Sequence, residues 1–258
     1  MKKQIEALNQ IINEQEDGKI GVLVPLWKRE GTAEAMMRHT VQMFKKIGVK
    51  GEFVAVGSEA SSEKLATSCG FKYVQSPNKP LSQKFQKGLD GMSRDVDGFI
   101  LLGSDDFINE TFLKNVIGNR QEISGPNGYF WININKLDSK DHNGVTLSYN
   151  GAYRPNDLVD AGVFFPKAFL ERNKWNLWGK TMKNKRVNDH WYIHLFKKQN
   201  VKPRIIDLNK GNIMVDVKSS MNITTSKHDK SSRYYDSFKV LKSMVSPQLI
   251  KLIMKDRD

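Results

Sequence analysis

The sequence predicts an α/β protein with a mainly parallel, mixed sheet flanked by helices. Short apolar runs alternate with segments of helical periodicity between residues 19 and 108, the pattern of parallel strands joined by right-handed crossovers. One of these runs, residues 98–102, ends close to two adjacent acids, Asp105 and Asp106. The 258 residues, 39% hydrophobic and 27% charged, are sufficient for a large globular core. Together these features indicate an open sheet with an acidic rim.

The first half of the chain follows a regular order of expected elements. A helix is expected over residues 1–15, where isoleucine and leucine recur at helical spacing. Strands are expected at 19–27, 52–57, 71–74 and 97–102, and helices at 32–47, 58–68 and 83–92. Residues 76–81 form a loop, because their two prolines do not fit inside regular structure.

The second half has a less regular pattern. We expect helices at 110–117, 167–172 and 188–196, a turn at 125–128, and strands at 129–132, 159–166 and 204–208, the last at a sheet edge. Residues 175–178 indicate an aromatic loop, and 218–232 are polar with little periodicity. A final helix is expected at 235–255, interrupted by Pro247.

Charge and cysteine content limit the possible classes of protein. Lys and Arg number 41 against 28 for Asp and Glu, a formal net charge of +13, which favours polyanions such as nucleic acid, anionic surfaces or a diphosphate. A lysine-rich composition with solvated faces explains the same excess. The single Cys69 excludes an internal disulfide. No apolar run reaches the roughly 18 residues of a membrane span and no signal-peptide core is evident, so we expect a cytoplasmic protein.

The acidic pair Asp105 and Asp106 has two interpretations. Carboxylates that follow a buried strand can hold a ligand or a metal ion at the rim of the sheet. Alternatively, they cap a helix that starts near Ile108, because Asp accepts hydrogen bonds from free helical N–H groups.

The order of several short motifs resembles nucleotide-sugar-dependent glycosyltransferases of the A-type (GT-A) fold, family-2-like. Residues 24–29 are similar to the segment that cups the nucleotide base, and 78–84 to the start of the helix that completes the base and ribose pocket. Residues 102–106 stand where the family has its Asp-x-Asp metal motif. Residues 161–166 resemble the glycine-containing strand of the acceptor half, and 188–190 fall where an acid often lies near the acceptor hydroxyl.

The resemblance implies a GT-A-like catalytic domain over residues 1–235, with a nucleotide-sugar half at about 19–108 and an acceptor half at about 109–217, followed by a helical extension over 236–258. It implies Mn²⁺ or Mg²⁺ held by Asp105, Asp106 and a late histidine, His228. The implied nucleotide-sugar-binding residues are Pro25, Leu26, Trp27, Lys28, Arg29, Asn78, Lys84, Ser104 and Lys218. For Lys218 and His228, a solvated surface position is the alternative.

The sequence departs from the metal motif of the family. A strict Asp-x-Asp spacing would need an acid at 103 or 104, where Gly103 and Ser104 stand. One carboxylate completed by water and phosphate oxygens still suits Mg²⁺ or Mn²⁺, which prefer hard oxygen ligands.

The acceptor half supplies further candidates. Asp189 is the expected general base for an acceptor hydroxyl, or else the N-cap of a helix beginning at His190. His190 and His194 have chelating spacing, but no third ligand lies at helical spacing on that face, which disfavours a zinc site. Trp175, Trp178 and His190 are the acceptor candidates. Asn176 and Gly179 indicate that the loop with the two tryptophans is exposed; the alternative for these tryptophans is the core.

These motifs predict an enzyme that transfers a sugar from a nucleoside diphosphate sugar, a UDP-sugar, to an acceptor hydroxyl. The charge permits nucleic acid as the partner, such as a hydroxymethylated pyrimidine in phage-type DNA, and equally a cell-surface glycan or a protein. A nucleotidyltransferase is an alternative, disfavoured because residues 25–31 contain one glycine where a phosphate loop needs several. A non-catalytic nucleic-acid-binding protein explains the charge but not the acidic pair.

Overall fold

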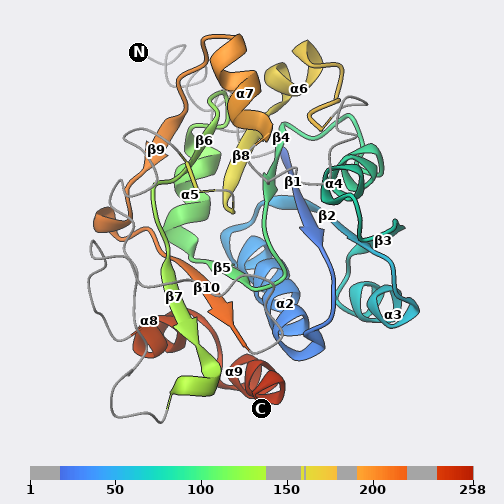
Figure 1. The fold of residues 1–258 in the computed structure, drawn as a ribbon. Coiled ribbons are helices and arrows are strands. Elements are labelled where there is room, and N and C mark those ends of the chain that lie inside the picture. Colours follow the sequence, from blue (N-terminus) through green and yellow to red (C-terminus); the bar gives the residue numbers. More distant parts are fainter. Residues whose placement is uncertain (1–17, 138–157, 160, 179–190, 220–236, 258) are drawn as a thin grey trace, which may run out of the picture.

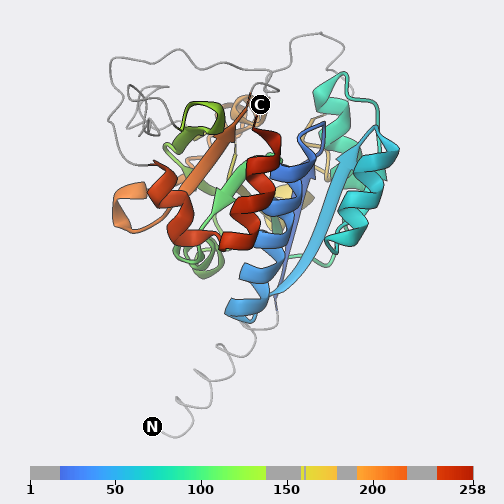
Figure 2. The same ribbon diagram turned by 90° about the horizontal axis from the view of Figure 1, so that it is seen from below.

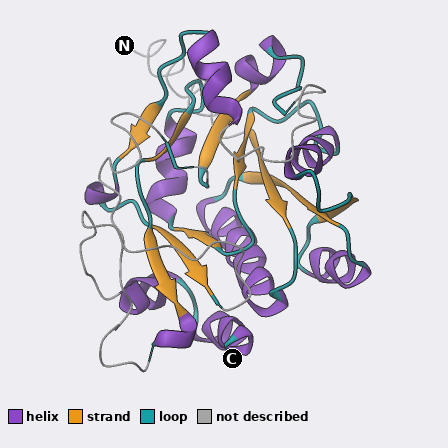
Figure 3. Ribbon diagram, viewed as in Figure 1, coloured by secondary structure: helices purple, strands orange, loops and turns teal. Residues whose placement is uncertain are grey.

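The computed structural model of the protein describes residues 18–137, 158–159, 161–178, 191–219 and 237–257. Within them the chain forms a seven-stranded sheet in the order β3-β2-β1-β4-β8-β6-β9 and a three-stranded sheet in the order β5-β10-β7. Helices lie around both sheets (Figure 1, Figure 3). The expected α/β fold with a mixed sheet is confirmed.

The strands of the large sheet are β1 (Lys19–Pro25), β2 (Lys50–Gly57), β3 (Lys72–Gln75), β4 (Gly98–Leu101), β6 (Ser124–Pro126), β8 (Val163–Pro166) and β9 (Arg204–Ile206). The first four pair in parallel, whereas β8 is antiparallel to both β4 and β6. In the small sheet, β10 (Met214–Lys218) runs antiparallel to β5 (Asp106–Ile108) and parallel to β7 (Phe130–Asn133). The parallel half is therefore the part predicted from alternating strands and helices.

The helices are α2 (Glu30–Ile47), α3 (Ala60–Ser68), α4 (Leu81–Asp90), α5 (Glu110–Gly118), α6 (Lys167–Arg172), α7 (Trp191–Lys198), α8 (Ser237–Met244) and α9 (Pro247–Ile253). Short 3₁₀ turns cover Ile134–Lys136, Leu208–Lys210 and Met254–Asp256. Among the described residues, no helix combines the length and apolarity that crossing a bilayer requires.

Side chains on the two faces of the sheet form two hydrophobic clusters. Along β1, Ile20, Val22 and Val24 point to the cluster that contains α2, whereas Leu23 points to the cluster that contains α4. This alternation follows from the period of two along a strand. Both faces of the central strands are thus buried, which explains their continuous apolar sequences.

Several elements differ from the sequence-based expectation. Residues 106–108 form strand β5, where no strand was expected. Residues 124–126 form strand β6 where a turn was expected at 125–128. The final helix is two helices, α8 and α9, because Pro247 starts a new helix capped by Ser246. Strand β10 was not expected at all: Met214, Val215, Asp216 and Val217 are all buried, so the alternation that marks a half-exposed strand is missing. The helix expected at 1–15 lies outside the described residues.

The C-terminal helices are packed against the first half of the chain. Seen from below, α9 lies beside α2 (Figure 2), whereas α8 packs against β7 and β10. Leu249 and Ile253 of α9 belong to the same buried cluster as Met36 and Met37 of α2. Residues close to the end of the sequence thereby support the helix that follows β1.

Gly98 tests the pairing between β4 and β8. A Cβ atom at this position would lie 2.4 Å from the Phe165 carbonyl oxygen and 2.5 Å from the Phe164 ring. We expect Gly98→Ala to lower the free energy of unfolding by about 2–3 kcal/mol, because backbone cannot yield as a side chain can. Urea unfolding measures the loss. Gly118→Ala is the control: its Cβ meets nothing within 4 Å, so an unchanged or slightly raised stability is expected, and equal losses would refute the steric explanation.

Candidate functional site

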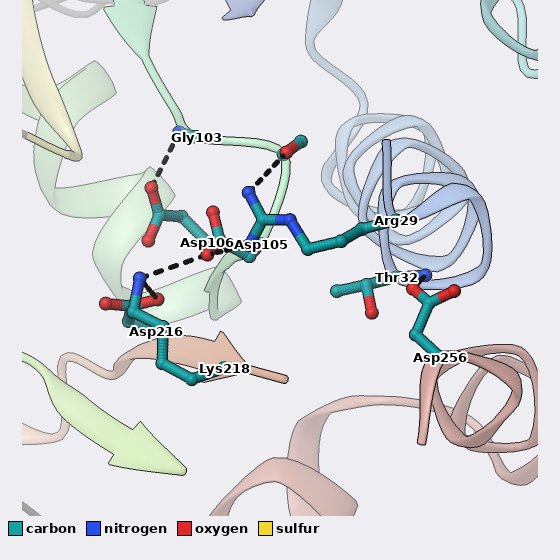
Figure 4. Close-up of polar contacts among 9 residues, drawn as sticks. Arg29, Thr32, Gly103, Asp105, Asp106, Asp216, Lys218 and Asp256 are labelled. Carbon is teal, nitrogen blue, oxygen red and sulfur yellow. Dashed lines mark hydrogen bonds and ion pairs between the residues drawn. The ribbon is translucent and has the colours of Figure 1, made fainter. Parts of the chain in front are cut away.

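Two loops meet where the parallel strands β1 and β4 end. Leu102 donates its backbone N–H to the Leu23 carbonyl oxygen at 3.0 Å, which holds the loop after β4 beside β1. On the other side, Lys28 and Arg29 both have left-handed backbone conformations, with φ of 56° and 52°. These two residues turn the chain from β1 into α2, and the Arg29 side chain reaches back to the loop after β4 (Figure 4).

Three carboxylates converge at this point. Asp105 lies in the loop after β4, Asp106 begins β5, and Asp216 lies on β10, directly opposite Asp106 in the antiparallel pair. One oxygen of each lies within 4.8 Å of the others, and the three residues are 6%, 6% and 7% exposed. The Asp105 carbonyl oxygen also accepts the Val217 N–H at 2.9 Å, which fixes β10 against this loop. The acidic rim predicted from the sequence therefore has a third member, on a strand that the sequence analysis did not assign.

Two cations lie among these acids. Arg29 donates through Nη1 to Asp105 Oδ2 at 2.5 Å and through Nη2 to Ser104 Oγ at 3.2 Å. Lys218 donates to the same Asp105 Oδ2 at 3.1 Å and forms an ion pair with Asp216 Oδ1 at 2.6 Å. Buried charges are stable only when they are paired, so these contacts explain how three carboxylates are accommodated together.

The charges shift the pKa values in opposite directions. Burial alone would raise the pKa of Asp105, but Lys218 and Arg29 outweigh it and hold that pKa well below the usual range. Burial and the adjacent Asp105 and Asp216 raise the pKa of Asp106. Burial, only partly offset by Lys218, raises the pKa of Asp216 to about 7. Although burial opposes it, the carboxylates raise the pKa of Lys218 above its ordinary value, so this lysine stays charged.

The surroundings of Gly103 explain why no acidic side chain stands at this position, where a strict Asp-x-Asp spacing would allow one. A Cβ atom at position 103 would lie 2.4 Å from Asp106 Oδ2 and 3.0 Å from Asp105 Oδ1. The Gly103 N–H instead donates to Asp106 Oδ2 at 2.6 Å. The carboxylates occupy the space that a side chain at 103 would need, and the additional acid comes from β10.

Two of the alternatives considered from the sequence are wrong. Asp105 and Asp106 do not cap the following helix; Asn109 caps α5, accepting the Phe112 N–H at 3.0 Å. Nor is Lys218 a solvated lysine, since its side chain is 16% exposed and paired with two carboxylates.

The expected base-binding loops are joined by a buried lysine. Lys84, on α4, donates to the Leu26 carbonyl oxygen at 2.5 Å and to Asn78 Oδ1 at 2.7 Å. Asn78 in turn donates to Ser58 Oγ at 2.7 Å. Burial lowers the pKa of Lys84 to about 8, because its partners are neutral oxygens. Lys84 thus holds the loop after β1 against the loop before α4.

Other predicted nucleotide-binding residues line the same loop. Pro25 ends β1, Leu26 is buried, and the Lys28 ammonium lies 4.8 Å from the centroid of the Trp27 ring. Trp27 is partly exposed and Lys28 is exposed, so both side chains are accessible at this edge.

The expectation of an exposed aromatic loop at residues 175–178 is wrong, because both of its tryptophans are buried. Trp178 is 1% exposed and stacks on Phe85 with ring centroids 5.2 Å apart. Trp175 is 8% exposed, with the Arg94 guanidinium 4.3 Å from its ring centroid. Both tryptophans belong to the hydrophobic cluster on the α4 face, which rules out the open stacking surface expected for an acceptor.

Asp189, His190 and His228 lie outside the described residues, so their expected roles stay predictions. Asp216 is the site residue that sequence reasoning missed. Its signal was an acid inside an otherwise apolar run, residues 213–217, because a buried carboxylate needs a partner or a ligand.

The three carboxylates fit a divalent metal ion. They offer hard oxygen ligands, as Mg²⁺ and Mn²⁺ prefer, from two chain segments, the adjacent Asp105 and Asp106 and the distant Asp216, within a span of 4.8 Å. Arg29 and Lys218, both on Asp105 Oδ2, lie where they can also contact a phosphate group.

No family model matches the chain, and no curated protein sequence matches it. Solved structures with a similar course of the chain include glucosyl-3-phosphoglycerate synthase from Mycobacterium tuberculosis in complex with Mn²⁺, UDP and phosphoglyceric acid, at a TM-score of 0.46 and 12% identity over 95% of this chain and 82% of that one. A Drosophila beta-1,4-galactosyltransferase 7 mutant with manganese, UDP-Gal and xylobiose matches at 0.43 and 13%, over 93% and 81%.

The 4-diphosphocytidyl-2C-methyl-D-erythritol synthase from Anaerococcus prevotii matches at a TM-score of 0.46 and 13% identity, over 92% of this chain and 98% of that one. At these values the similarity concerns only the course of the chain.

The raised pKa of Asp216 predicts a pH dependence of stability. Between about pH 4, the unfolded value, and about pH 7, the native carboxyl keeps a proton that the unfolded chain has released, so this group makes stability fall as pH rises. We expect Asp216→Asn to flatten that fall. Urea unfolding across this range measures it, with Asp90→Asn on the exposed side of α4 as control. An identical pH profile for wild type and Asp216→Asn would contradict the raised pKa.

Proposed function

We propose that the protein is a glycosyltransferase that uses a nucleoside diphosphate sugar, a UDP-sugar, together with Mn²⁺ or Mg²⁺. The observation that supports this most directly is the buried group of Asp105, Asp106 and Asp216 with Arg29 and Lys218, at the carboxyl ends of β1 and β4. Ligands of open α/β sheets bind at that edge.

The balance of charge at the site suits a diphosphate leaving group. With all carboxylates ionised, three negative charges face the two positive charges of Arg29 and Lys218. A divalent ion bound there would offset the negative charge that develops on the departing nucleoside diphosphate. Arg29 and Lys218 would orient the phosphates and share that charge. The three carboxylates, the two cationic side chains and the divalent ion would together carry a net positive charge, which favours binding of a diphosphate.

The loops next to the acids supply the remaining parts of the proposed nucleotide pocket. Trp27 offers a ring for the base, and Lys28 an exposed positive charge beside it. Lys84 and Asn78 act as supports, because their polar atoms already hold Leu26 and Ser58. Ser104 would orient Arg29, because its Oγ accepts a hydrogen bond from Arg29 Nη2.

The acceptor stays a prediction. We infer nucleic acid from the net charge of +13, with a hydroxymethylated pyrimidine in phage-type DNA as the specific hypothesis, and a glycan or a protein as alternatives. Asp189 is the proposed base and His190 a proposed acceptor contact, with His228 a third proposed metal ligand. A cytoplasmic location fits these proposals.

A nucleotidyltransferase remains the second candidate, because such an enzyme also needs carboxylates at a strand end. Residues 25–31 favour sugar transfer. Their one glycine, Gly31, lies in the first turn of α2 and is needed there for packing against α9.

Binding of sugar nucleotides tests the proposal. We expect Mn²⁺ with UDP-sugars to raise the melting temperature and to give slow hydrolysis of the donor. Asp105→Asn should abolish the metal-dependent part, because it removes the carboxylate that both cations hold, while far-UV circular dichroism stays native. Asp90→Asn is the matched control. If UDP, GDP and TDP sugars neither raise the melting temperature nor are hydrolysed, the proposed sugar transfer is refuted. Incorporation of a nucleotide from CTP or UTP would favour the nucleotidyltransferase.

Salt dependence tests the nucleic-acid acceptor. Affinity for duplex DNA should fall steeply between low and high salt, because phosphate contacts release counterions. Fluorescence anisotropy with a labelled duplex measures it. An affinity that does not change with salt would remove nucleic acid as the acceptor.

A further inference from the structure

No side chain at the N-terminus of helix α2 caps the helix. Its N-cap residue is Arg29, whose side chain makes no capping hydrogen bond. The free N–H groups of Gly31 and Thr32 donate instead to the two carboxylate oxygens of Asp256, at 3.2 Å and 2.6 Å. The cap of this helix therefore comes from a residue 224 positions away from Thr32 (Figure 4).

The contact between α2 and the C-terminal segment leaves little space. A Cβ atom on Gly31 would lie 2.3 Å from the Leu252 carbonyl oxygen and 3.1 Å from Asp256 Oδ1. Thr32 is 1% exposed. The backbone of α9 thus approaches the first turn of α2 closely enough to require glycine, and Asp256 lies directly over the two free N–H groups.

The capped turn is also the base from which Arg29 reaches the acids. The Arg29 carbonyl oxygen accepts the Ala33 N–H at 3.0 Å, so the first turn of the helix holds its backbone. Its guanidinium then lies on Asp105 and Ser104. The left-handed conformation of Arg29 is intrinsically unfavourable for a residue with a side chain, so it depends on its surroundings.

We propose that Asp256 is a positioning residue for Arg29, and that the C-terminal segment thereby forms part of the candidate site. Asp256 acts through the first turn of α2 and has no contact of its own with the acids. This inference rests on the proposed function only for the identity of the bound diphosphate; the coupling between Asp256 and Arg29 is a property of the chain itself.

The proposal predicts opposite effects on two ligands. Arg29 and a metal ion both use Asp105, so a loosened Arg29 competes less with Mn²⁺. The same loosened Arg29 is a poorer contact for a diphosphate. A merely structural loss of α9 packing would instead weaken both ligands together.

The test uses the full chain with Asp256→Ala, and Asp256→Asn as the milder variant that keeps one accepting oxygen. We expect UDP in the presence of Mn²⁺ to bind Asp256→Ala about threefold to tenfold more weakly, whereas Mn²⁺ alone binds equally or more tightly. Calorimetry measures the first and electron paramagnetic resonance the second. Ser246→Ala is the matched control, because it removes the cap of α9 but leaves the hydrogen bonds at the start of α2 in place, and it should change neither affinity.

A double-mutant cycle with Arg29→Ala separates positioning from packing. In Arg29→Ala the further change Asp256→Ala should alter neither UDP nor Mn²⁺ affinity, and the two substitutions should be non-additive in the free energy of unfolding. Additive effects, or weaker binding of both ligands, would overturn the proposal. If wild type binds neither ligand, the proposed function fails, and the cycle measured by urea unfolding still decides whether Asp256 positions Arg29.

Discussion

The arrangement of the site depends on one buried carboxylate. Asp105 Oδ2 accepts hydrogen bonds from Arg29, which follows β1, and from Lys218, which ends β10. A buried carboxylate without such partners would be costly, so the loop after β4 is stable only when both segments are in place. This requirement joins the large sheet, the small sheet and the start of α2 at one point.

The small sheet contributes three of the charged residues of the site: Asp106, Asp216 and Lys218. Antiparallel pairing places Asp216 opposite Asp106, and Lys218 two residues further on, so one strand delivers both an acid and its counter-ion. Gly103 leaves the space that the carboxylates of Asp105 and Asp106 fill. The result is a group of acids and cations suited to a metal ion and a diphosphate together.

Prediction from sequence was successful where structure depends on neighbouring residues. The alternating strands and helices from β1 to β4 were expected because their periodicity is local. It was wrong at 175–178, where Asn176 and Gly179 suggested an exposed loop but Trp178 stacks on Phe85. A polar neighbour does not decide burial when a distant helix supplies a hydrophobic surface.

By itself, the sequence determined the α/β class, the position of the acidic pair after β4 and the basic residues after β1, because each depends on a short stretch of chain. Only the tertiary structure decided that Asp216 joins Asp105 and Asp106, that Lys218 pairs across 113 positions of sequence, and that Asp256 caps α2. The physical reason is that pairing of buried charges and capping of free N–H groups are set by contact in space, which periodicity along the chain does not encode.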